Sequence, residues 1–225
     1  MNVKFRLTLM NFMQFFIWGS WLITIGVYWF QNKQWSGAEF GVIFSTMGIS
    51  SIFMPAITGI ISDRFINAEK LYGTMHILGA VVLFCLPLVD NPTTFFWVIL
   101  LNMIFYMPTL SLSITVAYSA LKNDNKDVVR DYPPIRIWGT IGFIAALWVV
   151  SLSGNEASSN QFYIASAVSL ALGIYSFSLP KCPPLGSKIQ TKTFVDALGL
   201  KAFTLFKQKK FAVFFLFSMF LGAAL

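Results

Sequence analysis

The chain has 225 residues, of which 56% are apolar types and only 11% are charged, and its mean hydropathy is +0.70. Soluble domains carry about 25% charged residues, so this composition excludes an ordinary water-soluble enzyme and makes lipid the expected solvent. The net charge of +7 resides in the loops, where it faces anionic lipid headgroups rather than nucleic acid.

Apolar segments long enough to cross the roughly 30 Å hydrocarbon layer as helices follow one another along the chain. The complete segments are predicted at residues 7–30, 39–62, 71–89, 94–119, 135–152 and 161–179, and a further one begins near Phe211. The sequence therefore predicts an all-α multi-span membrane protein. We expect a six-helix bundle at 1–180, a basic loop at 181–210, and the truncated start of a seventh helix at 211–225.

Basic residues gather in the loops on one side of these spans. They are Lys4, Arg6, Arg64, Lys70, Lys122, Lys126, Arg130, Lys181, Lys188, Lys192, Lys201, Lys207, Lys209 and Lys210. The opposite side has only Lys33, so the positive-inside rule places the amino terminus in the cytoplasm. Residues 191–209 mix lysines with apolar side chains, which fits either an interfacial helix or a flexible linker.

Polar and aromatic side chains form one stripe in the first span and another in the fourth. The stripes are Asn11, Gln14, Trp18, Trp21 and Tyr28, and Asn102, Tyr106, Thr109 and Ser113. Because polar groups are costly against lipid, both stripes are expected to face the bundle interior. They either hydrogen-bond between helices or line an aqueous cavity suited to a polar ligand with flat rings. The candidate wall of that cavity is Gln14, Trp18, Trp21, Asn102 and Tyr106.

Small residues give the second span a smooth face. They recur at spacings of three and four: Gly41, Ser45, Gly48, Ile52, Pro55 and Gly59. Such a face lets helix backbones approach closely, either as a packing contact or as a sliding contact between two moving halves.

The spans offer little for acid–base or metal chemistry. His76, the only histidine, is expected at the boundary of the third span rather than as a proton carrier. No carboxylate lies clearly inside a span, which argues against a membrane-embedded enzyme, a metal site or another cofactor.

The fifth predicted span holds the only charge placed clearly inside the membrane. Arg136, Thr140 and Phe143 share one face, and Gly139 and Gly142 form an adjacent small face. An intramembrane arginine indicates a functional site, although one near a helix end can instead extend its guanidinium to the cytoplasm. With a hydroxyl and a ring on the same face, Arg136 is suited to hold a polar aromatic solute.

Several short motifs resemble a known transporter family. Residues 59–64, Gly-Ile-Ile-Ser-Asp-Arg, resemble the Gly-x-x-x-Asp-Arg signature of the major facilitator superfamily, although its later glycine and basic pair are replaced at 65–68. Residues 54–56 (Met-Pro-Ala), 106–110 (Tyr-Met-Pro-Thr-Leu), 133–143, beginning Pro-Pro-Ile-Arg, and 148–154, beginning Trp-Val-Val-Ser, resemble the nucleoside:proton symporter branch more specifically. Residues 16–22 fit it too.

The resemblance extends over the whole chain and implies that it is the amino-terminal half of a permease. It implies twelve helices in two halves, a second six-helix half as partner, and proton-coupled nucleoside uptake by alternating access in a bacterial inner membrane. It also implies that Arg136, Thr140 and Phe143 contact the nucleoside, and that Asp63 and Arg64 belong to a cytoplasmic gate. A permease for another polar solute, such as a sugar, and a non-transporting scaffold half are the alternatives.

Overall fold

The computed structural model describes residues 2–184 and 205–224, which belong to two compact units, Met1–Pro184 and Leu185–Leu225. All regular structure in these described ranges is helical. This confirms the predicted all-α class.

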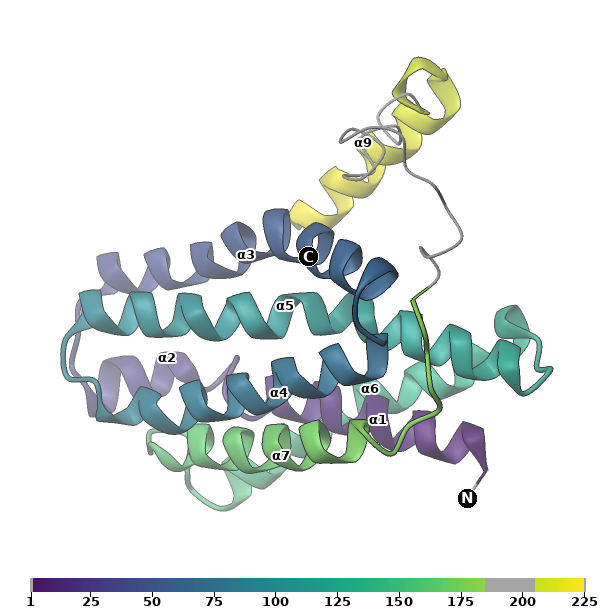
Figure 1. Ribbon diagram of the computed structural model, residues 1–225. Helices are drawn as coiled ribbons and strands as arrows, with labels where there is room; N and C mark the ends of the chain where they lie inside the picture. The colour runs from purple at the N-terminus through teal and green to yellow at the C-terminus, as the bar shows by residue number, and fades with distance from the viewer. Residues whose placement is uncertain (1, 185–204, 225) are drawn as a thin grey trace. The chain divides into compact units, whose positions relative to one another are not determined.

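The first unit is a bundle of long helices (Figure 1). They are α1 (Val3–Gly19), α3 (Gly37–Arg64), α4 (Ala68–Cys85), α5 (Pro92–Asn123), α6 (Val128–Leu152) and α7 (Asn160–Ser176). Short pieces lie between them: α2 (Ile25–Val27), the π-helix η1 (Tyr28–Asn32) and the 3₁₀ turn η2 (Leu86–Leu88). By length and composition, α3, α4 with η2, α5 and α6 are able to cross a membrane. Helices α1 and α7 have 17 residues each, the lower end of the usual range.

The first predicted span is not one continuous helix. Helix α1 ends at Gly19, and turns follow at residues 20–24 before α2 begins. The hydroxyl of Ser20 donates to the carbonyl of Phe16 at 2.8 Å, and the hydroxyl of Thr24 donates to Gln161 Oε1 of α7 at 2.8 Å. Side chains that hydrogen-bond in this way compete with the helix ladder and bend it, which the apolar pattern alone does not reveal.

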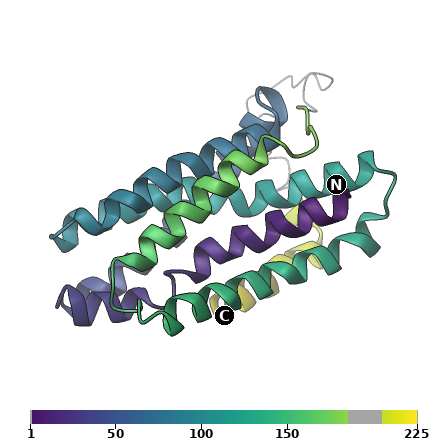
Figure 2. The same cartoon turned by 90° about the horizontal axis from the view of Figure 1, so that it is seen from below.

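Helix pairs pack along their lengths in the first unit. Helix α1 lies against α6, α4 against α7 and α5, and α3 against α5 (Figures 1 and 2). Close approach of α1 and α6 depends on glycine, because a Cβ at Gly142 would overlap the backbone of Phe12, and a Cβ at Gly19 would lie 2.5 Å from the Phe143 carbonyl oxygen. The small face predicted beside Arg136 therefore packs against α1.

The small face of α3 has a different environment. Built Cβ atoms at Gly41, Gly48 and Gly59 have no neighbour within 4 Å in the part of the chain that the structure describes. In the apolar 18-residue stretch of α3, only 17% is buried, whereas 50% is buried in the corresponding stretches of α4 with η2 and of α5. A packing contact inside the first unit is thus excluded for these glycines, and the sliding contact between halves stays a prediction.

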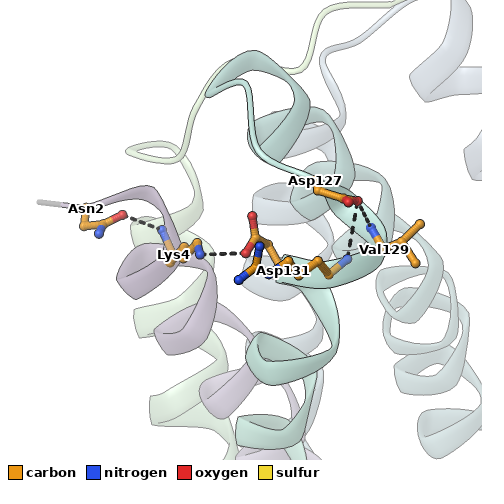
Figure 3. A network of polar contacts seen from close by, with 6 residues as sticks. Asn2, Lys4, Asp127, Val129 and Asp131 are labelled. Atoms are coloured by element: carbon orange, nitrogen blue, oxygen red, sulfur yellow. Dashed lines mark hydrogen bonds and ion pairs between the residues drawn. The ribbon is translucent and has the colours of Figure 1, made fainter.

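Helix α6 begins earlier than the sequence predicted. Its N-cap is Asp127, whose carboxylate accepts from the backbone N–H of Val129 at 2.9 Å and of Arg130 at 3.4 Å (Figure 3). An acidic cap stabilises the positive end of the helix dipole, so the helix starts at Val128 rather than at 135. Two prolines follow inside the helix without ending it.

Ion pairs join neighbouring elements at the two ends of the bundle. Lys4 Nζ of α1 lies 2.7 Å from Asp131 Oδ1 of α6 (Figure 3), and Lys33 Nζ lies 2.6 Å from Asp90 Oδ1. Burial of Lys33 lowers its pKa, but the hydrogen bond to Asp90 acts in the opposite direction and the net pKa is raised. Lys33 therefore stays charged and holds the turn after η1 to the loop before α5.

In the second unit, α9 (Lys209–Ala224) overlaps the predicted seventh apolar segment. The interfacial helix considered for residues 191–209 lies, up to residue 204, outside the described residues.

Candidate substrate-binding site

The candidate site is an open hollow along α6. Its lining consists of Tyr132, Pro133, Arg136, Ile137 and Thr140. The spacing of four residues places Tyr132, Arg136 and Thr140 on one stripe of the helix, and Thr140 is exposed. The sequence therefore predicted correctly that Arg136 and Thr140 share a face, and the structure shows that the first unit leaves this face open.

The guanidinium of Arg136 lies against the ring of Phe15 on α1. Its Cζ lies 3.9 Å from the centroid of the Phe15 ring, and Phe15 is about 18 Å along α1 from Val3 at 1.5 Å per residue. The guanidinium makes no ion pair or hydrogen bond with any described residue. The guanidinium is thus a cation that lies against an aromatic ring, away from the helix end. Its N–H groups donate to no described residue.

A second group of polar side chains lies buried between α1, α4 and α5. The amide of Gln14 donates to Thr109 Oγ1 at 2.9 Å, and its oxygen accepts from the hydroxyl of Tyr72 at 2.6 Å. His76 Nε2 lies 2.8 Å from the same oxygen. All four side chains are at most 1% exposed. We call Gln14, Tyr72, His76 and Thr109 the polar cluster.

Hydrogen-bond accounting fixes the roles within the polar cluster. Thr109 donates its hydroxyl proton to the Tyr106 carbonyl at 2.6 Å, so it can only accept from Gln14. The amide nitrogen of Gln14 therefore faces Thr109, and its oxygen accepts from His76, whose proton must be on Nε2. Every polar side-chain atom of Gln14, Tyr72 and Thr109 consequently has a partner, as buried polar groups require. The other ring nitrogen of His76, Nδ1, lies near Ser169, whose hydroxyl donates to the His76 carbonyl at 2.8 Å.

His76 is a core residue of the first unit. It lies near the middle of α4 and is 1% exposed, and its Nδ1 is 3.3 Å from the hydroxyl of Ser169 on α7. The prediction of a boundary histidine was wrong, because polar partners on α1 and α7 let the imidazole lie inside the apolar bundle.

Comparison with known proteins identifies the family. The family model described as "Nucleoside H+ symporter" matches residues 1–225. The chain belongs to the nucleoside H+ symporter family.

Relatives of known description support this membership. The nucleoside permease NupG and the xanthosine permease of Escherichia coli (strain K12) are each 47% identical over all 225 residues, which cover 54% of each relative. The crystal structure of the NupG D323A mutant matches 99% of this chain with a TM-score of 0.88 and 47% identity, over 55% of that chain. The chain thus spans about half the length of these relatives, which are described as permeases and not as enzymes.

Three of the predicted cavity-wall residues lie inside the bundle. Trp21 is 3% exposed and packs on Phe162, with 6.3 Å between ring centroids, and Asn102 donates to the Gly79 carbonyl at 3.2 Å. Gln14 belongs to the polar cluster. These residues make the interhelical contacts that the sequence left as one of two alternatives.

Trp18 and Tyr106 connect the polar cluster with Arg136. The Trp18 ring centroid lies 5.7 Å from that of Tyr106 and 6.4 Å from that of Phe15. Tyr106 donates to the backbone carbonyl of Gln14 at 2.7 Å, whereas Trp18 Nε1 is buried without a partner among the described residues. Through Phe15, these two rings link the polar cluster to the guanidinium of Arg136.

The remaining predicted site residues are not among those that line the hollow. Phe143 is partly buried one turn beyond Thr140, where its backbone meets Gly19. Asp63 and Arg64 form the carboxyl-terminal end of α3, with Asp63 exposed, and their role in a cytoplasmic gate stays a prediction. The described residues contain no group of His, Cys, Asp or Glu side chains that would hold a metal ion.

Sequence reasoning missed Phe15, Tyr72, Tyr132 and Ser169. A signal existed for Tyr72, because it precedes His76 by four residues and both then share one face of a helix. Tyr132 lies four residues before Arg136 and was recoverable in the same way. Phe15 is one of 24 phenylalanines, and nothing in its sequence position separates it from those that only fill space.

Proposed function

We propose that this chain is the amino-terminal half of a permease that takes up nucleosides together with protons by alternating access. The observation that carries the proposal is the open face of α6, where Arg136 and Thr140 line one hollow and the guanidinium has no polar partner among the described residues. The names of the relatives supply the solute class.

The chemistry of the α6 face suits a nucleoside. A guanidinium has N–H donors for ribose hydroxyls and base carbonyls, and a threonine hydroxyl both donates and accepts. Phe143, on the same side of α6, offers a ring for the base; stacking of a base on an aromatic side chain contributes about 1–3 kcal/mol in single-strand binding. A second six-helix half would close the hollow and supply the remaining contacts.

The loop charges support an orientation in the membrane. The basic loops include the end at which Lys4 pairs with Asp131, so we place this end and the amino terminus in the cytoplasm. Asp63 and Arg64 then lie on the cytoplasmic side, where a gate would operate. For a bacterial permease this membrane is the inner membrane.

Proton coupling is assigned to the second half. In the described part of the chain, the histidine inside the bundle is 1% exposed, and its Nε2 is bonded to Gln14. A coupling group must exchange its proton during each transport cycle, and a histidine buried in a polar cluster away from water is poorly suited to that role.

Uptake by the full-length protein tests the proposal. Uridine and xanthosine uptake should collapse when a protonophore is added. Arg136→Ala should lower apparent affinity about 10- to 100-fold, since a hydrogen bond to a charged group contributes about 1.5–3 kcal/mol. Arg130→Ala removes the same charge from an exposed position on α6 and serves as the control. Normal affinity in Arg136→Ala, at equal membrane abundance, would refute the site.

The Phe143 ring separates a nucleoside from a sugar-like solute. Phe143→Ala removes the stacking surface, whereas Phe143→Tyr keeps it. A nucleoside site predicts weaker uridine binding in the first variant only. Equal affinities in the two variants would favour a solute without a flat ring.

A further inference from the structure

The Arg136 guanidinium is held by an aromatic ring rather than by a carboxylate. Its Cζ lies over the Phe15 ring at 3.9 Å, well inside the roughly 6 Å limit of a cation–π contact. Phe15 comes from α1 and Arg136 from α6, so the contact spans a helix interface. A carboxylate would occupy the N–H donors, whereas the ring attracts the cation without using them.

Gly139 provides the space in which the guanidinium lies. A Cβ at this position would be 2.6 Å from Phe15 Cδ2 and 2.7 Å from Arg136 Nη1, closer than non-bonded carbon contacts allow. Gly139 is buried and lies between the two groups on the inner side of α6. The observed position of the guanidinium therefore requires glycine at 139.

Phe15 also differs from an ordinary core phenylalanine. It is only partly buried, and its ring faces both the guanidinium and Trp18. If Phe15 only filled space, an aliphatic side chain of similar size would serve equally well. If its π-face holds the cation, only another aromatic ring will replace it.

We infer that Phe15, with the space left by Gly139, is the positioning residue that presents the Arg136 N–H groups to the solute. This inference rests on the proposed function, because it assigns Arg136 to the nucleoside site. Phe15 acts through Arg136 and needs no contact with the nucleoside. Its removal therefore weakens binding only while Arg136 is present.

The test measures uridine binding and uptake in the full-length protein. Phe15→Leu should weaken uridine affinity about 3- to 30-fold, and Phe15→Tyr should restore it. The maximal transport rate at saturating uridine should stay unchanged in both. In the Arg136→Ala background, Phe15→Leu should cause no further loss. Phe5→Leu, at an exposed position of α1, is the matched control.

Gly139→Ala tests the same contact between Arg136 and Phe15 by a change in α6. The added methyl group should displace the guanidinium from the ring and weaken uridine affinity to a similar extent, with no further effect in Arg136→Ala. This variant keeps the inference testable if Phe15→Leu does not fold.

The outcomes separate the inference from the proposed function. Normal affinity in folded Phe15→Leu or Gly139→Ala, while Arg136→Ala loses affinity, would overturn the inference alone. So would an equal loss from Phe15→Leu with and without Arg136. Normal affinity in Arg136→Ala, or no uridine binding by the parent protein, would overturn both.

Discussion

The polar cluster around Gln14 and the α6 face around Arg136 are built from the same kinds of group and serve opposite purposes. In the cluster, every polar side-chain atom of Gln14, Tyr72 and Thr109 has a partner, His76 is bonded through Nε2, and almost no surface is exposed. On the α6 face, the Arg136 guanidinium contacts the Phe15 ring but has no polar partner among the described residues. Partner satisfaction, not polarity, therefore separates a structural polar group from a candidate binding group.

The two groups tolerate an apolar environment for different reasons. A satisfied cluster avoids the cost of burying donors and acceptors without partners. A guanidinium is weakly hydrated and lies well on an aromatic face, so Arg136 needs no counter-ion to remain at this depth. A ligand that supplies hydrogen-bond acceptors would then satisfy the N–H donors of Arg136.

Gln14→Leu should have the largest effect, a loss of stability of the polar cluster. It leaves Tyr72, His76 and Thr109 without a shared partner, and side-chain hydrogen bonds inside membrane proteins contribute about 0.6–1.7 kcal/mol each. We expect a loss of about 2–4 kcal/mol, seen as a lower Tm of the full-length protein in detergent. An unchanged Tm with weaker uridine binding would instead assign Gln14 a role in nucleoside binding.

His76→Leu should have an intermediate effect. The variant removes the bonds to Gln14 and Ser169 but leaves the Tyr72 and Thr109 contacts of Gln14 in place, so the expected loss is about 1–2 kcal/mol of stability. Because the histidine is treated as structural, the pH profile of uridine uptake should not change. A profile that becomes flat in His76→Leu would make this residue a proton carrier rather than a structural residue.

Thr140→Val should have the smallest effect, and on function only. The residue is exposed and lies outside the cluster, so the free energy of unfolding should change by less than about 0.5 kcal/mol. Loss of one neutral hydrogen bond to the nucleoside should weaken binding about 2- to 10-fold. A large drop in Tm with normal binding would reverse this assignment.

The apolar segments predicted the helical class and the order of the bundle, because length and hydropathy determine which segments can span lipid. Helix ends were less predictable. Asp127 starts α6 ahead of Pro133 and Pro134, and Ser20 and Thr24 interrupt the first span. These are side-chain hydrogen bonds that the hydropathy pattern does not contain.

The candidate site was predicted in part for a similar reason. The spacing of Arg136 and Thr140 places them on one face of α6 whatever surrounds the helix. Which polar stripes would be satisfied depends on the rotation of α1, α4, α5 and α7 against one another. His76 and Phe15 acquired their roles only from partners on other helices, and no pattern within a single span reveals those partners.

Ligand protection at Thr140 shows whether the α6 face binds the nucleoside. In full-length protein with its native cysteines replaced by serine, Thr140→Cys should react with a water-soluble thiol reagent, and uridine should slow that reaction. Arg130→Cys, on the same helix but outside the hollow, should react at the same rate with and without uridine. A Thr140→Cys labelling rate that uridine leaves unchanged, in a protein that still takes up uridine, would contradict the assignment of the α6 face to nucleoside binding.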